Sequence, residues 1–96
     1  MKECGIYILT NTGNKVLYVG ATTKGVRQRV WEHKEKLVKG FTAKYDLNKL
    51  VYYEFCDSIE QAFTREKQLK NWHRNWKMNL IQEFNPTWKD LYNDLE

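Results

Sequence analysis

Five side chains in this 96-residue sequence are of types that can act together on a phosphate ester: Tyr7, Tyr18, Arg29, His33 and Glu66. Hydrolysis of a phosphodiester needs a base to activate water, a cation to stabilise the pentacovalent phosphorus, and often a metal ion at the leaving oxygen. A tyrosine could be the base only if nearby positive charge lowered its pKa, which is ordinarily about 10. Arg29 and a divalent cation held by one carboxylate could supply that charge.

Each member of this set also has an ordinary structural explanation. Tyrosines in a β-hairpin usually pack in or around the core, and spacing alone favours that for both tyrosines. Arg29 could be a solvated helix residue paired with Glu32 or Glu60. His33 could be a capping or core histidine, and Glu66 could pair with an arginine, Arg29 included, without any metal. On spacing alone we favour these explanations over a role of the five residues in phosphodiester hydrolysis.

A β-hairpin should carry the two tyrosines. The apolar runs Ile6–Leu9 and Val16–Val19 flank a segment rich in Asn and Gly, which is typical of a hairpin. If the strands pair symmetrically about residues 11–14, Tyr7 lies directly opposite Tyr18, with about 5 Å between the Cβ atoms.

A helix should carry the arginine and the histidine. Apolar residues recur after the second strand at four- and seven-residue spacings: Val26, Val30 and Leu37. The pattern predicts a helix from about Gly25 to Lys39 that ends at Gly40, followed by a loop to Asp46. Arg29 and His33 are four residues apart, so they project from the same face of this helix.

The second half of the chain predicts one strand and two helices. Leu50–Phe55 is a compact β-prone run and predicts the third strand. Two residue pairs could form a capping box at the start of a helix that reaches about Lys70: Ser58 with Gln61, or Asp57 with Glu60. A further helix is expected over Trp72–Gln82, and Pro86 stops it. Two apolar residues should then dock a short tail: Trp88 and Leu91.

Glu66 falls within the apolar stripe of the first of these helices. The stripe is formed by Ile59, Ala62, Phe63 and Leu69, and should face the sheet. A carboxylate on that side needs a cation, a metal or hydrogen-bond donors as a partner. We therefore expect Arg29 and Glu66 to face the same pocket.

Composition narrows the class of protein. The chain is short enough for one domain over residues 1–96, and its 42% hydrophobic content is that of a globular protein. A formal charge of +4 favours a polyanionic partner. Cys4 and Cys56 are too few for a zinc cluster or a disulfide scaffold, which indicates a reducing compartment. The sequence shows no secretion signal and no membrane span, so we expect a cytoplasmic protein without membrane contact.

Basic and aromatic residues interleave at two places, a composition that suits phosphate contacts and base stacking. The candidate nucleic-acid-binding residues are Lys67, Lys70 and Arg74 near the C-terminal tryptophans, and Lys39 and Lys44 around Phe41. Alternatively, Trp72 and Trp76, four residues apart, pack against the protein and leave the cations solvated.

The ordered set Gly5-Ile6-Tyr7, Tyr18-Val19-Gly20, Arg29, His33 and Glu66 resembles the GIY-YIG nuclease superfamily. The second triplet has Val for Ile, a replacement also frequent in that family. Other segments resemble its small, single-domain bacterial branch: Gly40-Phe41-Thr42, Lys44-Tyr45, residues 65–70, Asn85-Pro86 and Trp88-Lys89. The likeness spans nearly the whole chain.

The resemblance implies an α+β fold, a three-stranded antiparallel sheet flanked by helices in the order β-β-α-β-α-α, with one site that binds Mg²⁺ or Mn²⁺. By position, Tyr7 and Tyr18 would supply the general base and its support, and which of the two is the base stays open. Arg29 would hold the scissile phosphate, His33 would assist, and Glu66 would bind the metal.

Three departures from the family pattern bear on these assignments. The turn before the first helix is one residue longer, so Arg27 rivals Arg29. Ala21 stands where some members have lysine, and Asn85 is a loose candidate for an asparagine near the metal.

We expect a monomeric, metal-dependent endonuclease whose partner is DNA, with branched and single-stranded forms included. The alternatives are a non-catalytic nucleic-acid-binding module and a protein-interaction domain that uses the tryptophan-rich helix.

Overall fold

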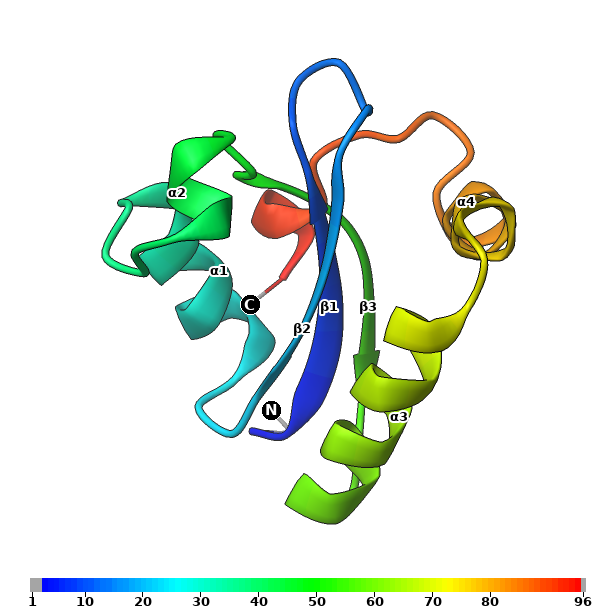
Figure 1. The fold of residues 1–96 in the computed structure, drawn as a ribbon. Helices are drawn as coiled ribbons and strands as arrows, with labels where there is room; N and C mark the ends of the chain where they lie inside the picture. Colours follow the sequence, from blue (N-terminus) through cyan, green and yellow to red (C-terminus); the bar gives the residue numbers. More distant parts are fainter. Residues whose placement is uncertain (1–2, 96) are drawn as a thin grey trace.

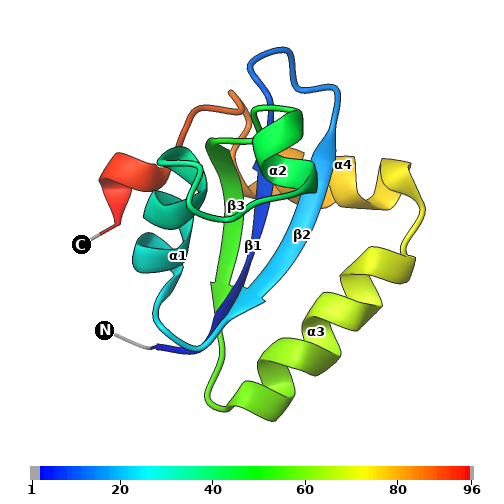
Figure 2. The same ribbon diagram turned by 60° about the vertical axis from the view of Figure 1, so that its left-hand side comes forward.

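Three antiparallel strands form one sheet in the order β2-β1-β3 (Figures 1 and 2). The structure is a computed structural model, and it describes residues 3–95. The strands are β1 (Gly5–Thr10), β2 (Leu17–Thr22) and β3 (Lys49–Phe55). The helices are α1 (Val26–Lys34), α2 (Phe41–Lys44), α3 (Ile59–Asn71) and α4 (Arg74–Phe84), and a 3₁₀ turn spans Tyr92–Asp94. The predicted α+β fold, with its three-stranded antiparallel sheet, is confirmed.

The central strand β1 is buried on both faces because helices cover each side of the sheet. Its alternating side chains enter two separate cores, as the pleat of a strand requires. Ile6 and Ile8 pack with Ala62 and Leu69 of α3. Tyr7 and Leu9 pack on the other face with α1 and the C-terminal tail, and the core residues there include Val26, Val30, Leu50, Leu91 and Leu95. Tyr7 is therefore a member of the core on the α1 side.

The strand register differs from the symmetric prediction. Tyr7 pairs with Gly20, and Tyr18 pairs with Leu9, two residues further along the ladder. The side chain of Asn11 accepts hydrogen bonds from the amides of Lys15 and Val16, at 2.8 and 3.3 Å, and so lengthens the turn. A shift of two residues leaves every side chain on its face, so both phenols still point to the same side of the sheet.

Helix α1 ends five residues earlier than predicted. The amides of Lys36 and Leu37 bond to the carbonyls of His33 and Glu32, at 3.0 and 2.9 Å, in the Schellman pattern. Lys36 occupies the left-handed position, with φ 57°, where glycine is usual. Leu37 is consequently outside the helix and 61% exposed, so its inclusion in the predicted helix was wrong.

The segment predicted as a loop after Gly40 contains the short helix α2. Gly40 reverses the chain with φ 108°, and Phe41 begins the helical turn. In α3, Ser58 caps the first turn by accepting from the amide of Gln61, at 3.2 Å, which confirms one of the two capping pairs. Two of the four stripe residues of α3 face solvent instead of the sheet: Ile59 and Phe63.

The C-terminal part of the chain docks against β3. Helix α4 begins at Arg74, two residues later than predicted, because Trp72 terminates α3. The amide of Leu91 bonds to the Leu50 carbonyl at 2.7 Å, and the Asp90 carboxylate accepts from the Leu50 amide at 3.1 Å. Leu91 is buried and Trp88 partly buried, as expected for a docked tail. Within residues 3–95 no helix has the length and apolar character needed to span a membrane.

Candidate active site

The centre of the candidate site is the hydroxyl of Tyr7, a residue of β1 whose side chain is 1% exposed. Gly20 on the neighbouring strand lies directly opposite and has no side chain to obstruct it. A Cβ atom at position 20 would lie 2.5 Å from both Cζ and Oη of Tyr7. The phenol therefore lies across β2, an edge strand, and brings its hydroxyl toward the far side of that strand.

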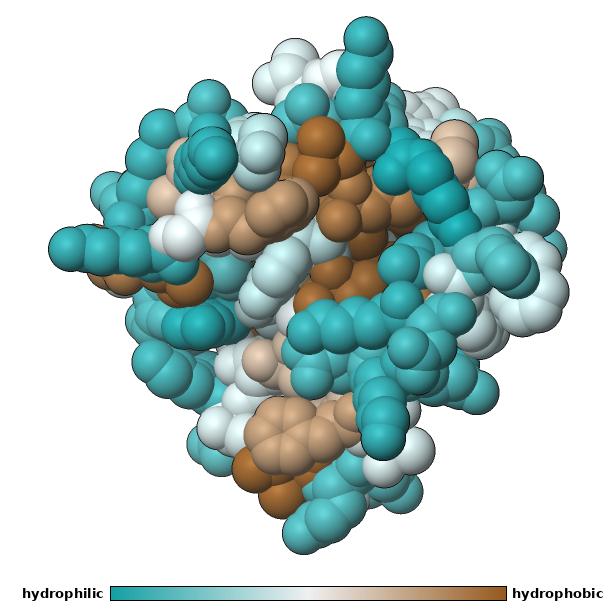
Figure 3. Space-filling view, in the orientation of Figure 1, coloured by the Kyte–Doolittle hydropathy of each residue, from teal (hydrophilic) through white to brown (hydrophobic). Residues whose placement is uncertain are grey.

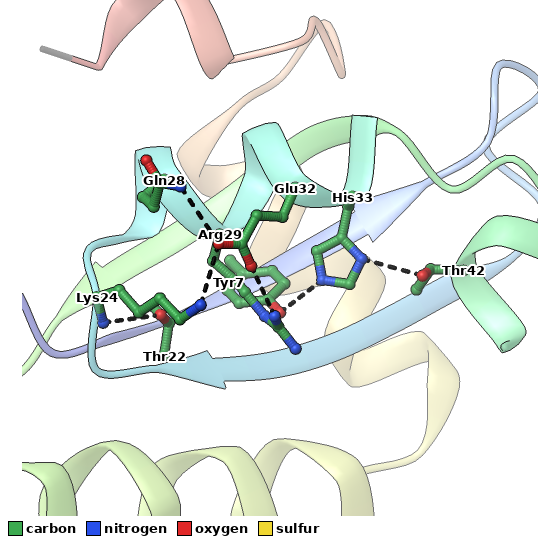
Figure 4. Close-up of polar contacts among 8 residues, drawn as sticks. All are labelled: Tyr7, Thr22, Lys24, Gln28, Arg29, Glu32, His33 and Thr42. Atoms are coloured by element: carbon green, nitrogen blue, oxygen red, sulfur yellow. Dashed lines mark hydrogen bonds and ion pairs between the residues drawn. The ribbon is translucent and has the colours of Figure 1, made fainter. Parts of the chain in front are cut away.

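His33 of α1 holds the Tyr7 hydroxyl in place (Figure 4). Its Nε2 lies 2.8 Å from the Tyr7 Oη, and its Nδ1 lies 3.0 Å from the Oγ1 of Thr42 in α2. Burial, helped by the positive charge of Arg29, lowers the pKa of His33 to about 4. The imidazole is thus neutral at pH 7, with one nitrogen that donates and one that accepts.

Arg29 brings a positive charge to the same hydroxyl. Its guanidinium interacts with the Tyr7 phenol, beside which Figure 4 shows it, and donates to the Glu32 carboxylate at 2.8 Å. Glu32 also accepts from Lys24 at 3.1 Å and from Gln28 at 3.2 Å. These three donors hold the pKa of Glu32 down at about 2, so the carboxylate stays ionised and fixes the guanidinium. The predicted alternative of an Arg29–Glu32 pair is confirmed, and it coexists with the contact to Tyr7.

Arg27, the rival arginine, points elsewhere. Its guanidinium carbon lies 4.5 Å from the centre of the Tyr92 ring in the C-terminal tail. Of the two arginines, the structure places only Arg29 beside the phenol of Tyr7.

The pKa of Tyr7 is raised and not lowered. Burial of the phenol is the largest cause, and the negative charge of an ionised Tyr18 adds to it. Arg29 acts in the expected direction and lowers the pKa, but burial outweighs it. The charge of Arg29 alone therefore does not lower the pKa of Tyr7 below its ordinary value, and without a divalent cation Tyr7 is a neutral hydroxyl.

Tyr18 lies on the same face as Tyr7, at the outer side of the cluster. Its ring centre is 6.4 Å from that of Tyr7 and 5.8 Å from that of His33. The ring is partly exposed and stacks on Phe41 of α2, with an angle of 26° between the ring planes. Tyr18 thus joins the buried part of the site to its surface.

Glu66 reaches the cluster from α3, which packs against β2 and β1. Its carboxylate is close enough to raise the pKa of Tyr7, a smaller effect than that of burial. The predicted cationic partner is Lys70, at 3.2 Å, and not Arg29. Arg29 and Glu66 nevertheless both affect the pKa of the Tyr7 hydroxyl, in opposite directions.

A metal ion at this site would rely on Glu66. Among residues 3–95 no three His, Cys, Asp or Glu side chains gather as a metal-binding group. The Glu66 side chain is 22% exposed, so its oxygens are accessible. One accessible carboxylate, completed by water and phosphate oxygens, fits Mg²⁺ or Mn²⁺, which bind proteins with few direct ligands. Asn85 does not contribute, because its side chain is buried and bonds to the backbone of Val51 and Lys89.

A groove opens beside Arg29. It is lined by Ala21, Thr22, Thr23, Lys24, Arg29 and Phe63. One wall comes from β2 and the turn after it, and the other comes from α3. The groove therefore lies next to Arg29 at the end of the edge strand, and Ala21 leaves room in it.

The five candidate nucleic-acid-binding cations do not form one patch. Lys70 lies at the site, with its ammonium 5.9 Å from the centre of the Tyr18 ring. Lys44 lies over the Tyr45 ring at 5.4 Å, and Arg74 donates to the Lys15 carbonyl at 2.6 Å. The two others are exposed on the surface: Lys39 and Lys67.

Sequence reasoning missed Thr42 as the partner of His33. Thr42 is 5% exposed, and its neighbour Phe41 is 50% exposed, so the turn presents one residue to the site and the other to solvent. No periodicity marks a helix of four residues, so only the Gly40-Phe41-Thr42 segment itself could have indicated this contact.

Comparison with known proteins gives a family match and a relative. The model of the GIY-YIG catalytic domain family matches residues 3–79. A UPF0213 protein from Syntrophus aciditrophicus (strain SB) is 35% identical over 84 residues, which cover 86% of this chain and 94% of that protein. No solved structure gives a significant match. On the family match and on this relative, the chain belongs to the GIY-YIG family of nuclease domains.

Proposed function

We propose that this protein is a metal-dependent endonuclease that hydrolyses DNA phosphodiester bonds. The observation that carries the proposal is the hydroxyl of Tyr7, which lies 2.8 Å from the neutral imidazole of His33 and beside the guanidinium of Arg29. A proton acceptor and a phosphate-binding cation thus meet at one buried oxygen next to an edge strand. The family match supports the nuclease class, and this geometry supports the residue roles proposed below.

The proton path runs through Tyr7 to His33. In the tautomer in which Nδ1 donates to Thr42, Nε2 of His33 is free to accept the Tyr7 proton. As that proton leaves, Tyr7 Oη takes a proton from water, and the resulting hydroxide attacks phosphorus. The bond from phosphorus to the leaving oxygen breaks, and that oxygen takes a proton from solvent. Tyr7 is then a relay, which suits a phenol whose own pKa is high.

Substrate binding favours this transfer. The positive charge of Arg29 is one cause of the low pKa of His33. A phosphate bound to Arg29 would neutralise that charge and raise the pKa of His33 toward its ordinary value. The imidazole therefore becomes a better proton acceptor when the scissile phosphate is in place. Arg29 meanwhile stabilises the charge that develops on the phosphate oxygens.

Glu66 would hold the divalent cation. A Mg²⁺ ion there would neutralise charge on the phosphate and the leaving oxygen. Before DNA binds, Lys70 neutralises Glu66 instead, at 3.2 Å.

Cleavage assays test the proposal directly. Purified protein is incubated with single-stranded, duplex and branched DNA, with Mg²⁺, with Mn²⁺ or with EDTA, beside Arg29→Ala and Glu66→Ala. We expect the wild-type protein to cut at least one substrate only when metal is present, and both variants to lose this activity. A wild-type protein that leaves all three substrates intact under every condition would rule out the enzyme.

The second candidate is a non-catalytic nucleic-acid-binding module. Lys70, Arg74 and Lys77 lie near one another on α3 and α4, and burial together with the two neighbouring charges lowers the pKa of Lys77. Such a cluster suits a phosphate backbone. This candidate predicts salt-sensitive binding that needs no metal and survives Glu66→Ala, without cleavage.

A further inference from the structure

Three aromatic rings form a continuous ladder that starts at the site and ends at the surface. The ring centres of Tyr18 and Phe41 are 6.4 Å apart, with nearly parallel planes at 26°. Those of Phe41 and Tyr45 are 4.8 Å apart at 49°. Phe41 is 50% exposed and Tyr45 is 43% exposed, so the outer part of the ladder offers ring surface to a ligand.

Helix α2 places this ladder with respect to the catalytic histidine. Gly40 turns the chain at φ 108°, and Thr42 is then buried against Nδ1 of His33 at 3.0 Å. Phe41 stands between Gly40 and Thr42 in the sequence, and its side chain points to solvent. Figure 3 shows apolar side chains over α2 and over the start of α3 on the face that carries β2. Two hydrogen bonds, one between Thr42 and His33 and one between His33 and Tyr7, therefore fix the exposed ring of Phe41 relative to the Tyr7 hydroxyl.

Two ammonium groups flank the ladder. Lys70 lies 5.9 Å from the centre of the Tyr18 ring, and Lys44 lies 5.4 Å from the centre of the Tyr45 ring. Flat apolar faces with a cation at each end match a ligand in which flat rings alternate with anionic groups. A nucleic-acid strand has that chemistry, whereas a purely apolar peptide offers no anionic group to either cation.

We propose that Phe41, backed by Tyr18 and Tyr45, is a stacking site for one unpaired base next to the bond that is cleaved. A base within an intact duplex has both of its faces covered by neighbours, so the stacked base must leave the helix or come from a single strand. Lys44 and Lys70 then bind the phosphates on either side of that base. The inference rests on the proposed function only in placing the cleaved bond at Tyr7; the stacking site itself follows from the ladder.

Binding measurements without metal test the site independently of cleavage. The probe is a short single-stranded DNA with 2-aminopurine at successive positions, in EDTA and at low salt. Wild-type protein should change the fluorescence at one position, and Phe41→Trp should keep this change. Phe41→Ala and Phe41→Leu should remove it and weaken binding about 5- to 160-fold, which is the range for one stacked base. The Phe41 variants and the wild-type protein should bind a fully paired duplex with equal affinity.

Phe84→Ala is the matched control. Phe84 is 46% exposed on α4 and contacts two rings, those of Tyr52 and Tyr53, so its removal costs a similar amount of packing away from the site. Equal affinity of wild type, Phe41→Ala and Phe84→Ala for the single-stranded DNA would overturn the stacking site. An equal loss of that affinity in both variants would overturn it as well. An apolar peptide that binds at Phe41 while DNA does not would overturn it too. A Phe41-dependent fluorescence change in a protein that cuts no DNA would keep the stacking site and refute the endonuclease.

Discussion

Tyr7 and Gly20 lie directly opposite each other on β1 and β2, and the phenol fills the space where a side chain at position 20 would project. The pair explains why a glycine stands in the second triplet. Gly5 in the first triplet has a similar reason, because a Cβ there would lie 2.6 Å from the Glu54 carbonyl oxygen. Both glycines permit close approaches that any other residue would obstruct.

Replacement of Gly20 by alanine should therefore damage the site. The new methyl group would push the buried ring of Tyr7 away from His33. Overpacking of a core site in this way costs about 1–3 kcal/mol of unfolding free energy. We expect Gly20→Ala to lose that stability in urea unfolding and to lose cleavage. Gly13→Ala is the control, because its Cβ would meet nothing closer than 3.8 Å. Equal stability and activity of the two variants would contradict the close packing.

The two arginines of α1 should separate activity from stability. Arg29→Ala removes the charge beside Tyr7 and should slow cleavage about 100- to 1,000-fold, as for the loss of one group that stabilises a transition state. Arg27→Ala loses its contact with Tyr92, at 4.5 Å, and should cost about 0.5–1 kcal/mol of stability with little change in cleavage. Single-turnover rates and urea unfolding of both variants measure the two effects. The reverse pattern would make Arg27 the phosphate-binding residue.

Stability should fall in mild acid because of His33. Its pKa falls from 6.5 in the unfolded chain to about 4 in the folded protein, so between these values the unfolded chain binds the additional proton. Folding stability should then decrease by about 2 kcal/mol from pH 7 to pH 5. Glu32 and Glu54 have lowered pKa values, and their contribution is lost only at more acidic pH.

Urea unfolding of the His33→Gln variant at the same two pH values provides the control. Glutamine does not titrate, so the difference between pH 7 and pH 5 should shrink to the contribution of the remaining groups. A wild-type protein with equal stability at both pH values would show that His33 is not buried as a neutral imidazole.

Metal binding should be weak and should compete with Lys70. Glu66 is a single carboxylate, and Lys70 lies 3.2 Å from it. Removal of that cation by Lys70→Met should tighten Mn²⁺ binding about two- to fivefold, the scale of an exposed ion pair, and Glu66→Gln should abolish it. The electron paramagnetic resonance signal of free Mn²⁺ reports the affinity, and Lys67→Met serves as the control. Unchanged affinity in Glu66→Gln would place the metal elsewhere.

The sequence predicted the sheet, the two main helix starts and the docked tail, because alternation, capping residues and proline are local signals. It did not predict the end of α1, since Lys36 takes the left-handed position and the glycine that usually marks such an end stands four residues later. The buried stripe of α3 was half wrong because the helix lies beside an edge strand, so Ile59 and Phe63 extend past the sheet.

The candidate site was predicted as a set of residue types and not as a set of contacts. Spacing placed both tyrosines on one face, and the parity of the strands preserved that despite the shifted register. Spacing could not show that burial raises the pKa of Tyr7, because that burial depends on segments distant in the sequence. The pair of Glu66 with Lys70, in contrast, joins residues four apart on α3, and spacing could have indicated it.

The cleavage rate of Tyr7→Phe tests the central claim most directly. The substitution removes only the hydroxyl that lies 2.8 Å from His33 and leaves the ring in its core. In single-turnover assays with Mg²⁺ and excess protein, we predict a rate at least about 100-fold below that of the wild-type protein, the usual scale for a lost proton-transfer group. Tyr92→Phe should cleave normally. A folded Tyr7→Phe protein that cuts DNA at the wild-type rate would contradict the account.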